Sequence, residues 1–270
     1  MKIIYDNVGQ TCNRLWSLVP TIYYNKVLNN KILVLFKGKD FDKFDHLRSC
    51  GNVTFIFKNK FMVKAFGNKY VQKIYSLLSV FPFLNLVNGW KSLLSFNVQY
   101  SKDDIDYMRS VFLPNQTIVE RVNKQFMPKI SLVIGIHVRR GDYRRFLNGK
   151  YFFEREDYEE VMEQLISYFK DPNILFFISS NEKIQFSDKY HTFCLNDGGA
   201  IDDLYGLSIC DYIVGPPSTF SQFASFLGQK PLLILWEKKQ KIIMENFAVY
   251  NHLSYTNSKE ENLSWLNSIK

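Results

Sequence analysis

The most chemically suggestive stretch of the sequence is 134–143, which reads Ile-Gly-Ile-His-Val-Arg-Arg-Gly-Asp-Tyr. Its apolar first half is typical of a buried parallel strand, and charged residues follow directly. Ligands of open α/β sheets bind where the strands end, so Arg139 and Arg140 lie where an anion is expected. Guanidinium forks match the oxygens of a phosphate better than lysines do. We therefore predict a phosphate site here, with a surface arginine pair salt-bridged to Asp142 as the alternative.

Residues 137–143, His-Val-Arg-Arg-Gly-Asp-Tyr, resemble the signature motif of the fucosyltransferase superfamily, which includes the α-1,2-, α-1,6- and protein O-fucosyltransferases. The resemblance implies a two-domain GT-B fold, GDP-fucose as the donor substrate, and no need for a metal ion or other cofactor. It also implies that Arg139 contacts the diphosphate and that His137 lies beside the nucleotide. Arg140 belongs to the same nucleotide-binding motif, and Asp142 is a candidate catalytic residue.

The stretch 202–221 resembles a later motif of the same superfamily, in which an Asp-bearing helix, a short strand and a hydroxyl-rich turn recur. The resemblance implies that Asp203 holds the edge of guanine and that Ser218 and Thr219 meet the β-phosphate. The chemistry agrees, because a carboxylate can accept hydrogen bonds from both N–H donors of guanine. Ser218 and Thr219 open a predicted helix whose free N–H groups attract phosphate. Thr219 and Gln222 have the spacing of a capping box.

The N-terminal strand-to-helix turn is a third candidate. A strand at 2–5 precedes Gly9, Asn13 and Arg14, and a helix is expected from 14 to 28. A glycine in such a turn permits close approach of the backbone to a ligand. Residues 9–14 also resemble the Gly-x-x-Asn-type loop of the fucosyltransferases. That resemblance implies that Gly9 and Arg14 help to bind the sugar nucleotide and that Asn13 takes part in catalysis.

Two questions about carboxylates stay open. An acceptor hydroxyl loses a proton as it attacks, so a carboxylate base is expected; Asp142, Asp6 and Asp40 are candidates in that order. Asp-x-Asp pairs at 40–42 and 104–106 are reminiscent of metal-binding pairs. We favour a structural interpretation of both, because such pairs are common and the resemblance to fucosyltransferases implies no metal. Ser101 and Asp104 also have the spacing of a capping box. We therefore expect no metal site.

Composition and pattern predict an α/β protein. With 270 residues, 46% of them hydrophobic, the chain can bury the cores of two domains. After Pro128 strands and helices alternate, which indicates a parallel sheet. We expect a GT-B-like arrangement of two Rossmann-like domains that face a cleft. The expected divisions are an acceptor-side domain at 1–127, a GDP-sugar-binding domain at 128–250, and a C-terminal helix at 251–270 that packs back on the first domain.

The cellular location follows from what the sequence lacks. It has no apolar run of 18 or more residues and no N-terminal signal pattern. Its four cysteines show no metal-ligand spacing, which suits a reducing cytoplasm. We expect a cytoplasmic enzyme.

A basic stretch suggests membrane contact. No acidic residue occurs between Asp45 and Asp103, whereas eight lysines and arginines do, which equals the net charge of +8. Aromatic and aliphatic residues alternate with these cations, so the stretch suits the inner face of an anionic membrane. An ordinary amphipathic helix with a solvated face is the alternative. No recognition motif supports nucleic-acid binding.

The resemblance to the fucosyltransferase superfamily implies an inverting fucosyltransferase that moves L-fucose from GDP-β-L-fucose to a hydroxyl of an oligosaccharide or lipid-linked glycan, as in the synthesis of bacterial surface polysaccharide. Two other functions stay open. One is a GT-B glycosyltransferase that uses another nucleotide sugar, and the other is a non-catalytic protein that binds a sugar nucleotide or glycan.

Overall fold

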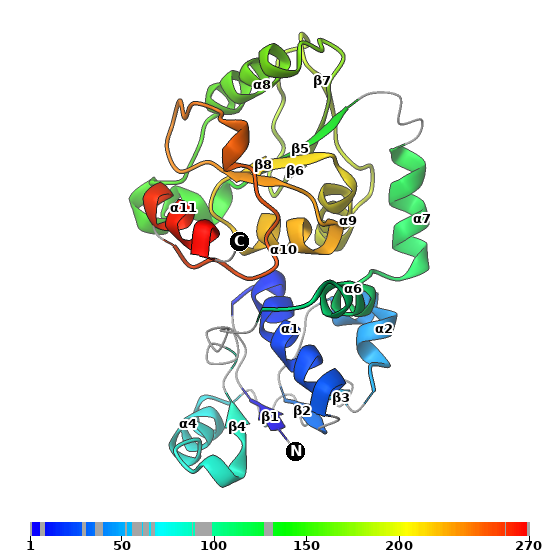
Figure 1. Ribbon diagram of the computed structural model, residues 1–270, viewed down its shortest axis with the longest axis vertical. Coiled ribbons are helices and arrows are strands. Elements are labelled where there is room, and N and C mark those ends of the chain that lie inside the picture. Colours follow the sequence, from blue (N-terminus) through cyan, green and yellow to red (C-terminus); the bar gives the residue numbers. More distant parts are fainter. Residues whose placement is uncertain are drawn as a thin grey trace. The chain divides into compact units, whose positions relative to one another are not determined.

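The structure is a computed structural model, and it describes residues 2–5, 9–28, 31–35, 40–51, 53–55, 61, 65, 68–87, 89, 99–126, 132–256 and 258–268. The chain folds into two compact units, residues 1–115 and 116–270. Figure 1 labels their helices and strands. None of the helices in the described part combines the length and the hydrophobicity that crossing a membrane requires.

The first unit contains a parallel sheet with strand order β3-β2-β1-β4. Its strands are β1 (Lys2–Ile4), β2 (Ile32–Val34), β3 (Val53–Phe55) and β4 (Leu86–Val87). From β1 the chain adds β2 and β3 on one side, and β4 then pairs with the other side of β1. The strand order therefore reverses beside β1, and the residues that follow β1 occupy the position where such sheets hold ligands.

Several helices accompany this sheet. Beside α1 (Thr11–Leu28), the described residues form α2 (Asp45–Arg48), α4 (Lys69–Leu78) and α6 (Lys102–Val111), with 3-10 turns η1 (Phe41–Lys43) and η2 (Pro82–Leu84). The capping box predicted for α6 is confirmed, because the backbone N–H groups of Ser101 and Asp104 each donate to the other residue's side chain.

The start of α1 differs from the prediction. The helix begins at Thr11 rather than Arg14, so Asn13 and Arg14 lie in its first turn and not in a loop. The physical reason is that Gly9 has a positive φ of 47°, which turns the chain early. The backbone N–H of Arg14 can then donate to the carbonyl of Gln10 at 3.2 Å.

The second unit contains a larger parallel sheet with strand order β7-β6-β5-β8-β9. The strands are β5 (Val133–Val138), β6 (Leu175–Ser180), β7 (His191–Phe193), β8 (Tyr212–Gly215) and β9 (Leu232–Ile234). Every residue of β5 is buried, as its continuous apolar sequence predicts for a central strand. The chain runs from β5 to β6 on one side and later to β8 on the other, so the order reverses between β5 and β8.

Helices cover both faces of this sheet. The helix α8 (Arg155–Phe169) lies on one face, and α9 (Ala200–Ile209) and α10 (Thr219–Gly228) lie side by side on the other (Figure 1). Crossovers between parallel strands are right-handed, so a crossover that runs in one direction along the sheet puts its helix on one face. A crossover that runs in the other direction puts its helix on the opposite face. The described residues of this unit also form the 3-10 turns η3 (Gly141–Arg144), η4 (Phe146–Gly149) and η5 (Met244–Asn246).

Two terminal helices also belong to this unit. The helix α7 (Gln116–Gln125), which the sequence pattern did not predict, packs against α9. In α11 (Lys259–Ser268), Asn262 accepts a hydrogen bond from the Tyr250 hydroxyl at 2.9 Å, and the Trp265 ring stacks on Tyr250. The α/β class is confirmed. The second compact unit begins at Gln116, whereas the sequence suggested a boundary at 127/128.

The packing of α9 on α10 generates a stability prediction. A Cβ on Gly228 would lie 1.8 Å from the backbone carbonyl oxygen of Ser208. Gly228→Ala must push the two helices apart, and we expect it to lower the free energy of unfolding by about 3 kcal/mol in a urea titration. Gly198→Ala is the graded control, because its new Cβ would meet only side-chain carbons at 3.2 Å. Equal losses in the two variants would contradict this account.

Candidate functional site

The candidate site lies at the carboxyl ends of β5 and β8, where the strand order of the second sheet reverses. Open α/β sheets bind ligands at this point, because the loops from the two neighbouring strands diverge there. The loop after β5 carries Arg139, Asp142 and Tyr143, and the loop after β8 leads through Ser218 into α10. Two motifs that are far apart in the sequence therefore meet at one edge.

His137 lies at the bottom of this site. It is 4% exposed, pairs in register with Ser179 of β6, and its ring centroid lies 5.1 Å from that of Phe220 in α10. Burial, and secondarily the charge of Arg139, lowers the pKa of His137 to about 3, so the imidazole is neutral. Within the described residues, its Nδ1 atom has no hydrogen-bond partner. His137 can therefore offer a neutral ring nitrogen to a ligand.

Arg139 extends from the end of β5 toward solvent. Its Nη2 atom donates to Asp142 at 2.9 Å, and its guanidinium carbon lies 5.5 Å from the centroid of the Tyr143 ring. The Arg139 side chain is 16% exposed, whereas that of Asp142 is 52% exposed. An incoming anion could therefore replace an exposed carboxylate as the partner of a guanidinium that is already oriented.

Arg140 is engaged differently. Its side chain contacts the carboxylates of Glu154 and Glu182 at 3.3 and 3.4 Å, and its guanidinium carbon lies 4.7 Å from the centroid of the Phe152 ring. Its backbone N–H donates to Asn181 at 2.8 Å. These contacts tie the loop after β5 to neighbouring segments. They favour a positioning role for Arg140 over direct phosphate contact, and a role in nucleotide binding stays a prediction.

Tyr143 joins the two loops, a contact that the sequence did not reveal. Its hydroxyl donates to the backbone carbonyl of Pro217 at 2.5 Å. The next residue, Ser218, is the N-cap of α10 and accepts from the backbone N–H of Phe220 at 3.2 Å. The position of the Arg139 loop is thus coupled to the N-terminal end of α10, where a helix favours negative charge.

The capping box predicted from Thr219 and Gln222 is wrong. The cap is Ser218, and Thr219 is the first helical residue. Gln222 is buried and exchanges hydrogen bonds with the backbone of Ser254, because its side chain faces the interior rather than the helix end.

Asp202 and Asp203 lie in the first turn of α9 and have different surroundings. Asp202 is 1% exposed, accepts from the backbone N–H of Gly199, and forms an ion pair with Arg121 of α7. Asp203 instead accepts from the hydroxyl of Ser179 at 3.3 Å. Burial, partly opposed by that hydrogen bond, raises the pKa of Asp203 to about 7. Asp202 is therefore satisfied within the protein, and Asp203 remains near the strand that carries His137.

The remaining predicted residues lie in the first unit. The guanidinium of Arg14 donates to the carbonyl of Gly9 at 2.7 Å, and a Cβ on Gly9 would clash with Asn13. These three residues therefore form one local cluster after β1. Asp40 pairs with Lys43 at 3.2 Å and accepts from the Thr11 hydroxyl at 3.3 Å. Asp6, another candidate base, lies outside the described residues.

The other acidic features have structural partners. Asp104 pairs with Lys26 at 2.8 Å, and Asp106 pairs with Arg109 at 2.9 Å. Over the described ranges, no group of three or more His, Cys, Asp or Glu side chains is arranged to hold a metal ion.

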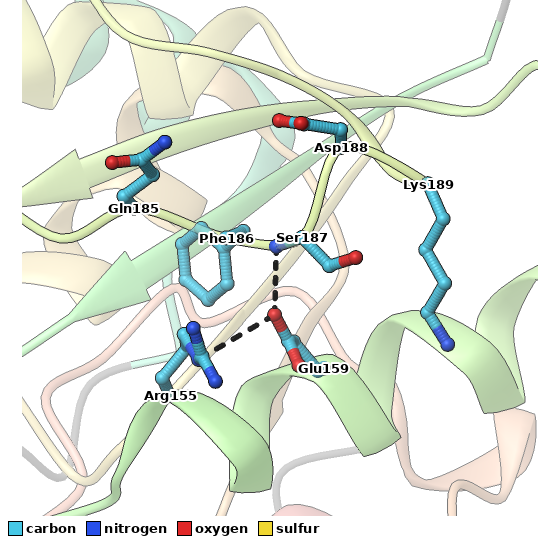
Figure 2. Close-up of a pocket in the computed structure, with 7 residues that line it drawn as sticks. All are labelled: Arg155, Glu159, Gln185, Phe186, Ser187, Asp188 and Lys189. Carbon is cyan, nitrogen blue, oxygen red and sulfur yellow. Dashed lines mark hydrogen bonds and ion pairs between the residues drawn. The ribbon is translucent and has the colours of Figure 1, made fainter.

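A pocket of about 660 Å³ lies elsewhere on the second unit (Figure 2). The Glu159 carboxylate accepts from the backbone N–H of Ser187 at 2.8 Å and pairs with Arg155 at 3.7 Å. No predicted site residue lines this pocket, whose lining residues are Arg155, Glu159, Gln185, Phe186, Ser187, Asp188 and Lys189.

Fucosyltransferases are among the solved structures whose fold is similar to that of this chain. A mutant of FUT1 from Arabidopsis thaliana in complex with GDP matches with TM-score 0.55 and 15% identity over 92% of this chain and 73% of that chain. NodZ from Bradyrhizobium matches with TM-score 0.52 and 14% identity over 86% and 95% of the two chains. POFUT1 in complex with GDP-fucose gives 0.53 and 10% over 87% and 97%. The likeness confirms the predicted GT-B-like fold class.

The family is shown by a sequence comparison. The family model for glycosyl transferase family 11 matches residues 53–251, which is most of the chain. The protein therefore belongs to glycosyl transferase family 11 and is a glycosyltransferase. The comparison with curated proteins gives no significant match.

The burial of Asp203 generates a pH-dependent prediction. Its pKa rises from 3.8 to about 7, so the folded protein keeps a proton that the unfolded chain releases. The stability that this proton supplies is full below about pH 4 and is lost as the pH rises through 7. Asp203→Asn avoids the charge, and we expect it to stabilise the protein by about 2 kcal/mol more at pH 8 than at pH 5.

Urea unfolding at the two pH values measures this difference. The control is Asp188→Asn, which removes a carboxylate from an exposed loop and should give no such difference. A gain from Asp203→Asn that is the same at pH 5 and pH 8 would show that this carboxyl is not buried as described.

Proposed function

We propose that this glycosyltransferase transfers L-fucose from GDP-β-L-fucose to a hydroxyl of a glycan acceptor, with inversion at the anomeric carbon. The observation that carries the proposal is the convergence of His137, Arg139, the Ser218-capped helix end and Asp203 at one sheet edge. A nucleoside diphosphate has two negatively charged phosphates and a base with hydrogen-bonding groups. Arg139 and the N-terminal end of α10 suit the phosphates, and Asp203 suits the base. The solved structures of similar fold include complexes with GDP and with GDP-fucose, which supports the same donor here.

In the proposed reaction the acceptor oxygen attacks C1 of fucose from the face opposite the diphosphate. The C1–O bond to the β-phosphate breaks, and GDP leaves with the electron pair. Arg139 and the N-terminal end of α10 stabilise the charge that gathers on the departing phosphate, because both favour anions. The acceptor proton passes to a carboxylate base, for which Asp142 is the first candidate, since its side chain is 52% exposed at the mouth of the site.

Each other residue has a narrower role in this proposal. Neutral His137 donates or accepts one hydrogen bond beside the nucleotide, and Thr219 adds a hydroxyl at the helix end. Gly9 and Arg14 are proposed to help bind the sugar nucleotide, and Asn13 is proposed to take part in catalysis. The acceptor is an oligosaccharide or a lipid-linked glycan.

Thermal unfolding with added nucleotides tests the donor. A ligand at about 100 times its dissociation constant adds about 2.7 kcal/mol of stability. We expect stabilisation by GDP and GDP-fucose and much less by UDP. Release of GDP from GDP-fucose that depends on an added glycan then tests transfer. Equal stabilisation by UDP would argue for another donor, and binding without turnover across an acceptor panel would argue for a non-catalytic protein.

Arg139 gives the first functional prediction. Arg139→Ala should lower kcat at least about 100-fold, because a contact with the leaving group strengthens in the transition state. Arg139→Lys should also be strongly impaired, since lysine lacks the planar fork. The matched control is Arg144→Ala, because Arg144 is 52% exposed and pairs with Glu182 at 2.7 Å. Near-normal kcat in Arg139→Ala with an unchanged melting temperature would place the phosphate contact elsewhere.

Asp203 gives the second functional prediction. Asp203→Asn replaces one hydrogen-bond acceptor that would face guanine with an NH2 donor. Because guanine presents its own N–H donors there, we expect GDP affinity to fall by about 2 kcal/mol. Because the pKa of Asp203 is about 7, the affinity of the unaltered protein for GDP should fall about tenfold between pH 8 and pH 6 as the carboxylate is protonated.

Calorimetric titrations at both pH values measure these effects. The Asp203→Asn variant also serves as the control for the ionisation of GDP itself. That ionisation affects both proteins equally, and only the contribution of Asp203 is missing from the variant. A pH dependence of the same size in both proteins would remove Asp203 from the nucleotide site.

A further inference from the structure

The helix α4 and the turn that follows it expose an unusual amount of apolar surface. The Tyr70 side chain is 80% exposed, Leu77 65% and Phe83 75%. No residue of α4 is buried. Other exposed apolar residues of this segment are Ile74, Leu78, Val80 and Phe81. Isolated apolar side chains on a surface are ordinary, but seven within fourteen residues form a patch that marks an interaction site.

The exposed side chains lie along one face of the helix. Tyr70, Ile74 and Leu77 follow the i, i+4, i+7 spacing and form a single stripe. Tyr75, on another face, packs against Tyr5 at the end of β1 with ring centroids 5.5 Å apart. The helix therefore has a contact with its own unit and still presents an apolar stripe to solvent. A helix whose apolar stripe served only the protein core would bury that stripe.

The charges beside the stripe are all positive. Lys69 and Lys73 are exposed and lie one position before Tyr70 and Ile74, so they border the stripe on one side. The nearest acidic residues in the sequence are Asp45 and Asp103. A second copy of the chain would bring lysines against lysines if the stripes paired, which is unfavourable. An anionic lipid surface would instead satisfy both the apolar stripe and the cations.

We propose that residues 69–83 form a membrane-binding surface for anionic phospholipid. With ten residues α4 is about 15 Å long, so it lies in the plane of the interface and does not cross it. Tyr70, Ile74 and Leu77 enter the boundary between headgroups and acyl chains, and Lys69 and Lys73 contact phosphates. The surface shares no residue with the candidate site, and its function does not depend on which sugar the enzyme transfers.

Co-sedimentation of the full chain with lipid vesicles tests the proposal. We expect binding to phosphatidylcholine vesicles that contain phosphatidylglycerol, little binding to pure phosphatidylcholine, and loss of binding at high salt. Lys69→Gln with Lys73→Gln should weaken binding about 30-fold, from about fivefold for each lysine. Ile74→Ser with Leu77→Ser should weaken it more than tenfold, because two apolar side chains no longer enter the interface.

The matched control is Lys124→Gln with Lys241→Gln, which removes the same charge from exposed positions of the second unit and should leave binding unchanged. Circular dichroism verifies that each variant is folded. No binding to phosphatidylglycerol at low salt, equal binding to neutral vesicles, or equal weakening by the control pair would overturn the proposal. The proposal would also be overturned if the protein formed a dimer without lipid and Ile74→Ser with Leu77→Ser dissociated that dimer. The stripe would then be an interface with a second copy of the chain.

Discussion

The site depends on one constraint, the parallel pairing of β5 with both β6 and β8. This pairing sets His137 beside Ser179 in the register and brings Gly215 close enough to His137 that a Cβ there would lie 2.8 Å from the histidine Cβ. The loops that leave β5 and β8 then begin at one edge but diverge. Arg139 and the N-terminal end of α10 come together because parallel strands align their carboxyl ends, and the Tyr143 hydroxyl fixes the distance between the loops through Pro217.

Two adjacent carboxylates near this edge, Asp202 and Asp203, have different surroundings. Asp202 is buried, pairs with Arg121 and accepts a hydrogen bond at the cap of α9, which is how a buried carboxylate is tolerated. Among the described residues, the hydroxyl of Ser179 donates to Asp203, and partial burial raises the pKa of this carboxyl. A group left under-satisfied in this way costs stability and is typical of a functional position. The two arginines after β5 also differ in their partners. Arg140 pairs with Glu154 and Glu182, whereas Arg139 pairs with the exposed Asp142.

The two units offer different kinds of surface. The second unit presents a polar edge of fixed geometry, in which each loop is held by side chains from another segment. The first unit presents Gly9, Asn13 and Arg14 after β1 and, separately, the apolar stripe of α4. A glycosyltransferase has to bind its donor and also reach its acceptor, and the proposed lipid-binding surface would concentrate the enzyme beside an acceptor that is linked to lipid.

The sequence alone determined the central strand, the order of strands and helices after it, and the fucosyltransferase-like motif at 137–143, because these depend on local pattern and residue type. It also predicted the capping box of α6, whose two partners are three residues apart. From the sequence, α1 was expected to begin later than it does, and α7 was not predicted. The cap of α10 was assigned to the wrong residue. Only the tertiary structure decided that Asp202 pairs with Arg121, that Ser179 meets Asp203, and that Tyr143 bonds Pro217. Each of these contacts joins residues at least 24 positions apart, and burial, which raises the pKa of Asp203, is a property of the folded chain rather than of any segment.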